Sequence, residues 1–182
     1  AAFGTPEVNA VVAWNPQLAE IKSAKGAKEV FNSAAIPGEI VDTLAVSTDA
    51  LKADPNLGKA LAGIWYETLA VMTRQDAAGA AAREAMAKLS GTDLANYESQ
   101  LKTTYLYADP KAAAAFAKSP ELSAATDKVR KFAFDVGLYP KGAASADVIG
   151  IEMPDGTVMG DKANVKMRFD AAYMQMAADG AL

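Results

Sequence analysis

The most constraining feature of this sequence is an apolar run from Val8 to Ala13 that stops at Trp14-Asn15-Pro16. Nearly every position in the run is apolar, as in a strand buried on both faces of a parallel sheet. Proline lacks a backbone donor, and its φ angle suits the first turn of a helix, so the strand is expected to end here. In open parallel sheets, ligands bind beyond the carboxyl ends of the strands. The sequence therefore predicts an α/β fold with a binding site near Trp14.

Two further strands are predicted close to the first one. A short helix over residues 17–23 precedes a strand over 28–33, and a Pro-Gly loop over 34–38 leads into a third strand over 40–46. Small residues in such a loop allow the backbone to approach another group closely. We expect the loop and the strand ends to form one site.

The candidate ligand-binding residues lie at these strand ends, in the loop and in the third strand. An indole can stack on a planar or cationic group, an amide offers a donor and an acceptor, and a hydroxyl beside loop N–H groups can bind an anion. Structural alternatives are a core indole, a helix cap, an ordinary turn and, for the charged residue within the third strand, an ion pair with a lysine. The candidates are Trp14, Asn15, Ser33, Pro37, Gly38, Glu39 and Asp42.

After Ser47 the apolar pattern becomes helical, and capping residues mark the helix starts. Gly63 lies within one of these predicted helices, where glycine costs roughly 1 kcal/mol relative to alanine, so close packing is expected there. A short strand is predicted over 103–107, and a hairpin over 147–152 and 157–159 with its turn at 154–156. The predicted helices begin near Asp54, Asp76, Asp93, Asp109 and Ser119, and a last one covers 170–178.

Composition excludes several function classes. The chain has no cysteine and no histidine, which removes thiol nucleophiles, imidazole bases and the common zinc and copper sites. Its net charge is −4 and its basic residues are scattered, so nucleic-acid binding is disfavoured. No apolar run reaches the roughly 18 residues of a membrane span. We expect a binding protein that needs no cofactor or metal, rather than an enzyme. Residues 1–5 resemble a helix end with its glycine cap, so the chain is expected to begin within a fold.

Three stretches together resemble the C-terminal half of solute-binding proteins of ABC importers, of the nitrate, sulfonate, taurine and thiamine-precursor type. The first is the strand that ends in Trp14-Asn-Pro16, and the second is Ile36-Pro-Gly-Glu-Ile-Val-Asp-Thr-Leu-Ala-Val46. The third is Asp49-Ala-Leu-Lys-Ala-Asp-Pro-Asn-Leu57, followed by a helix with Trp65. The order and spacing match the family pattern over about residues 8–72.

The resemblance implies a helix-rich, partial type-II periplasmic-binding-protein fold with two α/β lobes and its N-terminal half absent. Residues 1–46 would be the remainder of the second lobe, and 47–182 the helical remainder of the first lobe with a C-terminal hairpin. The ligand would lie in the cleft between the lobes. The resemblance places Trp14, Asn15, Ser33 and the Pro37-Gly38 loop at that cleft.

The function implied is that of the substrate-binding component of an ABC transporter, which captures a small organic or anionic solute and delivers it to a permease. The expected partners are the solute, the membrane permease and the missing N-terminal half of the same protein. The expected location is the periplasm or the outer face of the cytoplasmic membrane. One alternative is a pyrimidine-synthase-like enzyme on the same fold, which the absence of histidine and cysteine opposes. Another is a ligand-free interaction or sensor protein.

Overall fold

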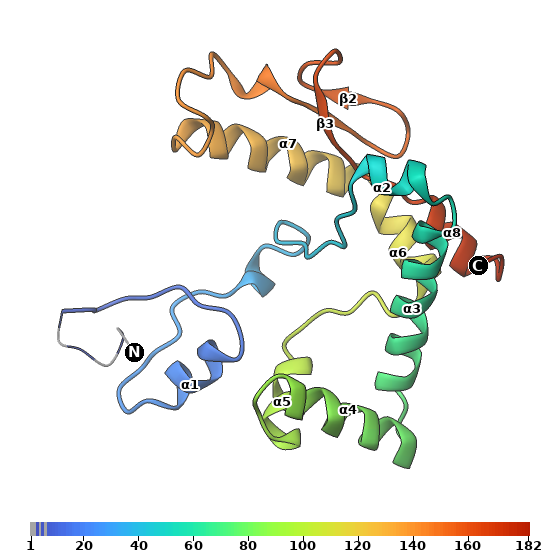
Figure 1. Cartoon of the computed structure of the whole chain (residues 1–182). Helices are drawn as coiled ribbons and strands as arrows, with labels where there is room; N and C mark the ends of the chain where they lie inside the picture. Colours follow the sequence, from blue (N-terminus) through green and yellow to red (C-terminus); the bar gives the residue numbers. More distant parts are fainter. Residues whose placement is uncertain (1–2, 4, 6) are drawn as a thin grey trace. The chain divides into compact units, whose positions relative to one another are not determined.

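The computed structural model of the 182-residue chain describes residues 3, 5 and 7–182 (Figure 1). It divides into two compact units, which are described separately below. The first comprises Ala1–Asn32 and Ala70–Leu106, and the second Ser33–Leu69 and Tyr107–Leu182. The division into two lobes, over residues 1–46 and 47–182, stays a prediction. The glycine cap expected within residues 1–5 falls largely on residues outside those described.

The first unit contains α1 (Gln17–Ser23), α4 (Ala77–Leu89) and α5 (Leu94–Leu101). The paired helices α4 and α5 are held together by Arg83, which donates to a carboxylate oxygen of Glu98 at 2.8 Å and to the Met72 carbonyl at 2.9 Å. Tyr97 adds a hydroxyl contact to the sulfur of Met86 at 3.5 Å. This unit is therefore a small helical assembly joined by one arginine and a few side chains.

The second unit contains most of the helices and all the strands that the structure describes. Its α-helices are α2 (Thr48–Ala53), α3 (Leu57–Met72, whose last turn belongs to the first unit), α6 (Pro110–Ala117), α7 (Pro120–Asp135) and α8 (Ala172–Ala178). Short 3-10 turns lie at η2 (Ser33–Ala35) and η3 (Ala146–Val148). Helices α6 and α8 pack against each other.

A three-stranded mixed sheet lies beside α7 in this unit (Figure 1). Strand β1 (Gly150–Glu152) pairs antiparallel with β2 (Val158–Met159) and parallel with β3 (Val165–Arg168). Ile151 on the central strand lies opposite residues of both neighbours. The core consists of buried Leu122, Ile151 and Met153, with Phe116, Met159 and Phe169 packed around them.

The helix starts and the hairpin predicted from capping residues are largely confirmed. The side chains of Asp76, Asp93, Asp109 and Ser119 accept hydrogen bonds from the first turns of α4 to α7. The hairpin turn is also confirmed, since the Gly156 amide donates to the Met153 carbonyl at 2.9 Å. The predicted start at Asp54 is displaced, because this residue ends α2 and α3 begins at Leu57. Helix α2 and strand β3 were not predicted.

The strands predicted over 8–14, 28–33, 40–46 and 103–107 are wrong. Within the described part of the chain, none of these segments pairs with a neighbour, and their backbone is extended or irregular. A strand exists only through hydrogen bonds to another strand, and a pattern of apolar residues does not supply that partner. Val12 and Val30 are accordingly 89% and 96% exposed. The α/β class holds in a coarser form, as a helix-rich chain with one small mixed sheet.

Close packing in α3 occurs at a different glycine from the one predicted. A Cβ atom added at Gly63 would meet nothing within 4 Å, so the expectation for that residue is wrong. A Cβ atom added at Gly58 would overlap the ring of Tyr173 on α8. The glycine that allows close approach is therefore Gly58. No helix among the described residues is both long enough and apolar enough to cross a membrane.

Candidate functional site

A groove of about 320 Å³ in the second unit is the candidate binding site. It lies between the loop around residues 38–43, one face of α7 and the sheet, and most of its lining is apolar. The loop contributes Gly38, Glu39, Val41 and Thr43. Helix α7 contributes Leu122, Ala125, Thr126, Val129, Arg130 and Ala133, and Tyr139, Ile151, Met167 and Phe169 complete the lining.

The loop is shaped by its own backbone and fixed by one ion pair. The amide of Glu39 donates to the Ile36 carbonyl at 3.2 Å, which closes a tight turn. Gly38 within this turn has a φ of +78°, a conformation that favours glycine, and it lies against the ring of Phe116. The ammonium of Lys128 on α7 then lies 2.6 Å from the Glu39 carboxylate. The turn and the ion pair together hold the loop beside α7.

Arg130 forms the polar side of the groove, but its guanidinium is committed to the protein. It donates to Asp127 at 2.8 Å, to Asp147 at 2.6 Å and to the Ala146 carbonyl at 3.1 Å. Burial by itself lowers the pKa of Arg130, but the hydrogen bonds to Asp147 and Asp127 outweigh burial and raise it.. The hydroxyl of Tyr139 also donates to the Ala146 carbonyl, at 3.3 Å. Arg130 therefore joins α7 to η3 and is not available as an anion-binding group.

The lining determines which ligands the groove can take. Its floor consists of aliphatic, aromatic and thioether side chains, as in sites for organic molecules. The polar groups left for a ligand are the Glu39 carboxylate and the hydroxyls of Thr43 and Thr126. Within residues 3, 5 and 7–182, no group of three acidic side chains could hold a metal ion. The geometry suits an apolar ligand with a few hydrogen-bonding groups.

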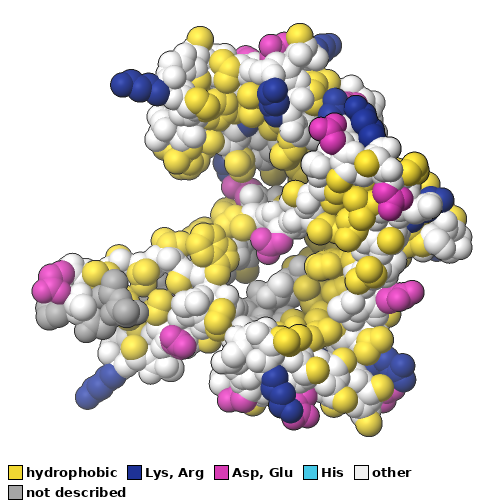
Figure 2. Space-filling model, viewed as in Figure 1, with side chains coloured by type: hydrophobic (Ala, Val, Ile, Leu, Met, Phe, Trp, Pro, Cys, Tyr) yellow, Lys and Arg dark blue, Asp and Glu magenta, His cyan; other side chains and the backbone are white. Residues whose placement is uncertain are grey.

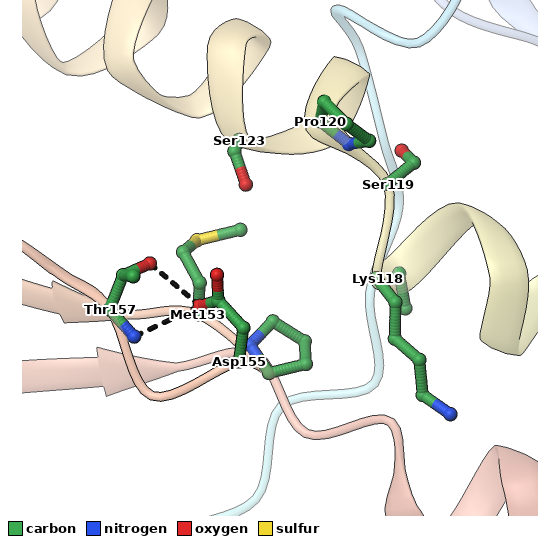
Figure 3. Close-up of a pocket in the computed structure, with 9 residues that line it drawn as sticks. Lys118, Ser119, Pro120, Ser123, Met153, Asp155 and Thr157 are labelled. Carbon is green, nitrogen blue, oxygen red and sulfur yellow. Dashed lines mark hydrogen bonds between the residues drawn. The ribbon is translucent and has the colours of Figure 1, made fainter.

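A second hollow of about 310 Å³ lies where the α6–α7 junction faces the turn between β1 and β2 (Figure 3). Ser119, Ser123, Met153, Asp155 and Thr157 are among its lining residues. The Asp155 carboxylate accepts hydrogen bonds from the hydroxyl and the amide of Thr157, at 2.7 and 2.9 Å, and both lower its pKa. Ser119 caps α7. Because these groups serve the turn and the helix start, this hollow is the weaker candidate.

The structure brings two of the seven predicted ligand-binding residues, Gly38 and Glu39, into the groove. Ser33, Pro37 and Asp42 belong to the same unit, but they are exposed and do not line the groove. The role assigned to these three stays a prediction.

Trp14 and Asn15 belong to the first unit. Trp14 is 72% exposed, which contradicts the alternative of a core indole. The amide nitrogen of Asn15 lies 3.4 Å from the hydroxyl of Thr103, and no side chain caps α1, so the cap alternative is also wrong. Their proposed contact with a ligand stays a prediction.

The groove also contains residues that the sequence pattern did not single out. One of them is Arg130, whose partner Asp127 lies three positions earlier on the helix and outside the lining. Opposite charges meet at this spacing, so the pair was a readable signal. Met167 and Phe169 alternate with charged residues at the end of β3, a weaker signal in a strand of four residues. Neither pattern shows that these side chains face the loop at residues 38–43.

Comparisons with protein-family models, with curated proteins and with solved structures gave no match.

Proposed function

We propose that this chain is part of the substrate-binding component of an ABC transporter, which captures a small solute and delivers it to a membrane permease. The observation that carries the proposal is the position of the Gly38-Glu39 loop. The family resemblance places Pro37-Gly38 at the ligand cleft, and the groove is built from the same loop together with α7 and the sheet. Binding would be followed by closure of the cleft, and no bond would be made or broken.

The exposed apolar segments of the chain support the same proposal. The segments over 8–14 and 40–46 have the apolar composition of buried strands, and the segment over 28–33 contains Val30 and Phe31, yet Val12, Val30 and Leu44 are largely exposed. Apolar surface of this extent is typical of a site that another protein segment covers. In a partial type-II periplasmic-binding-protein fold, an N-terminal half of the same protein would supply strands that pair with these segments. The proposal therefore includes that half and the permease as partners, in the periplasm or at the outer face of the cytoplasmic membrane.

The groove favours an organic solute over a small inorganic anion. Its floor is apolar, and two cations at the groove are already paired with carboxylates: Arg130 in the lining, and Lys128, which is bound to the lining residue Glu39. An anion would have to displace one of these partners, whereas an apolar body could bind without doing so. Glu39 would accept a hydrogen bond from a donor on the solute.

Isothermal titration of the chain with nitrate, taurine, an aminopyrimidine and riboflavin tests this proposal. We expect saturable binding of one of the organic probes. A Met167→Glu substitution, which places a charge in the groove, should abolish this binding. Lys166→Glu, at the neighbouring exposed position of β3, should leave it unchanged. Equal affinity of both variants for the bound probe would contradict the assignment of the site.

A second experiment tests the predicted partner and the Trp14 assignment. Native mass spectrometry of the purified protein, followed by the same sample denatured, should show a second polypeptide in association with this chain. A chain that remains alone and binds none of the four probes would contradict the proposed function.

The Trp14 assignment is tested by the affinity of the Trp14→Ala variant for the bound probe. If this variant keeps the affinity of wild type, Trp14 is not part of the pocket. Trp65→Ala, on α3, serves as the matched control.

A further inference from the structure

Helix α7 and its C-cap residue Val136 carry a row of apolar side chains, here called the α7 stripe: Ala125, Val129, Phe132 and Val136. Val129, Phe132 and Val136 are 47%, 61% and 52% exposed, and Ala125 is half-buried. The intervals between the four residues are four, three and four positions, which is the spacing of the contact seam of a coiled coil. The stripe therefore has the pattern of a helix-pairing surface.

The packing of the second unit leaves this stripe largely uncovered. The part of α7 that faces the core carries buried Leu122 and the guanidinium of Arg130, which belong to an adjacent face of the helix. Ala125 and Val129 also line the groove, so a solute in the groove and a second copy on the stripe would compete for these two side chains, whereas Phe132 and Val136 lie outside the groove. Hydrophobic side chains are visible over the region that Figure 1 labels α7 (Figure 2). An aromatic residue and two valines in one row are more than the scattered apolar residues of an ordinary surface.

The charges beside the stripe indicate its occupant. Lys128 and Asp135 are seven positions apart and flank the stripe on the same side. If two α7 helices pack antiparallel, with Val129 of each opposite Phe132 of the other, each Lys128 lies beside Asp135 of the second copy. In a parallel pair, Lys128 would instead lie beside Ala133 of the second copy, and no charge pair would form. The charge pattern is thus self-complementary under a two-fold axis.

We propose that the α7 stripe is the contact surface for a second copy of this chain, bound in antiparallel orientation. Val129 packs against Phe132, Ala125 packs against Val136, and the two Lys128–Asp135 pairs lie along one edge of the contact. Lys128 keeps its bond to Glu39, because an ammonium has three donors and can bridge two carboxylates. Asp135 forms none of the ion pairs observed within the described residues, so its carboxylate is available. This surface is one short helix long, so the dimer is weak and concentration-dependent.

Charge reversal followed by sedimentation velocity tests the proposed register. Lys128→Glu and Asp135→Lys each place like charges together in both of these pairs, and each should weaken dimerisation by about tenfold. The double variant should recover the wild-type dimer, and so should an equal mixture of the two single variants, in which every edge pair again has opposite charges. Nonspecific association through the exposed segments over 8–14 or 28–33 would not produce this recovery. If neither the double variant nor the mixture recovers the dimer, or if wild type remains a monomer at all concentrations, the proposal is overturned.

Cysteine cross-linking gives an independent test, because the chain has no native cysteine. An equal mixture of Val129→Cys and Phe132→Cys chains should form a disulfide-linked heterodimer under mild oxidation. A mixture of Lys131→Cys and Phe132→Cys chains is the control, since Lys131 lies on α7 outside the stripe, and it should cross-link far less. Equal cross-linking of the two mixtures would overturn the antiparallel register. All these substitutions are at exposed positions, and circular dichroism would verify that each variant remains folded.

Discussion

The ammonium of Lys128 lies 2.6 Å from the carboxylate of Glu39, although 89 positions separate the two residues in the chain. This ion pair connects α7 to the loop that borders the candidate groove. Both partners are partly exposed, and such pairs contribute little to overall stability. The main role of the ion pair is therefore to fix the position of the loop. The mobility of the loop can be measured separately from the contribution of the pair to stability.

Removing either partner should free the loop while barely changing global stability. In a double-mutant cycle with Glu39→Gln and Lys128→Met, we expect a coupling energy of about 0.2–1 kcal/mol, which falls as salt is added. Amide hydrogen exchange over residues 38–43 should be faster in each single variant. Unchanged exchange in that loop would show that the backbone turn alone holds it.

Arg130 should be the most sensitive charged residue of the second unit. Its side chain is only 11% exposed and has three protein partners, so Arg130→Ala removes a donor from Asp127, Asp147 and the Ala146 carbonyl. Asp127 then keeps only the bond from Lys131, and the Ala146 carbonyl keeps only the one from Tyr139. We expect a loss of about 2–4 kcal/mol in the free energy of unfolding, measured by urea denaturation. Arg130→Lys should recover only part of the loss, because lysine lacks the planar fork. Lys131→Ala, at a 60% exposed position nearby, should change stability by about 0.5 kcal/mol or less.

Replacing Gly58 or Gly63 of α3 by alanine should change the stability of the protein in opposite directions. Gly58→Ala forces the Tyr173 ring away from α3, and overpacking of this kind costs about 1–3 kcal/mol. Gly63→Ala meets open space inside the same helix, and it should stabilise the protein by about 0.5–1 kcal/mol through helix propensity. Thermal unfolding of the two variants measures both effects. A destabilising Gly63→Ala would mean that another chain packs on that position.

Stability should fall at acidic pH partly because of Asp127. Hydrogen bonds from Lys131 and then from Arg130 lower the pKa of this carboxyl below its ordinary value. The folded protein therefore binds the proton less readily than the unfolded chain does. The resulting stabilisation is present above the unfolded pKa, about 4, and is lost as pH falls through the lower folded pKa. Asp127→Asn should reduce the loss in the free energy of unfolding at acidic pH, measured by urea unfolding at a series of pH values. The control is Asp42→Asn, at an exposed residue with no ion pair among those described, and it should leave this loss unchanged.

The helices could be predicted because their signals are local. A side chain at Asp76, Asp93, Asp109 or Ser119 bonds to an amide within three positions, so the sequence contains both partners of each cap. The hairpin turn at 154–156 is local in the same way. Helix α2 was missed although Ser47 caps it, because its six residues are too few to show a clear period.

The strands predicted in the N-terminal segments do not form, because an apolar run is only part of what a strand requires. The run from Val8 to Ala13 has the composition of a buried strand, but pairing requires a second strand at a suitable register. The residues of the groove could likewise be predicted only in part from the sequence. Gly38 and Glu39 were identified from their loop, whereas Arg130, Met167 and Phe169 reach the site only through the packing of α7 and β3.

The sequence by itself determined the capped starts of α4 to α7, the hairpin turn and the absence of thiol and imidazole chemistry, because each depends on residue identity or on neighbours a few positions apart. Tertiary structure alone decided that Glu39 meets Lys128, that Gly58 rather than Gly63 faces an aromatic ring, and that α7 leaves an apolar stripe exposed. Those outcomes depend on contacts between segments tens of residues apart. Such contacts form only when burial of the core fixes which faces meet, and no local pattern specifies that choice.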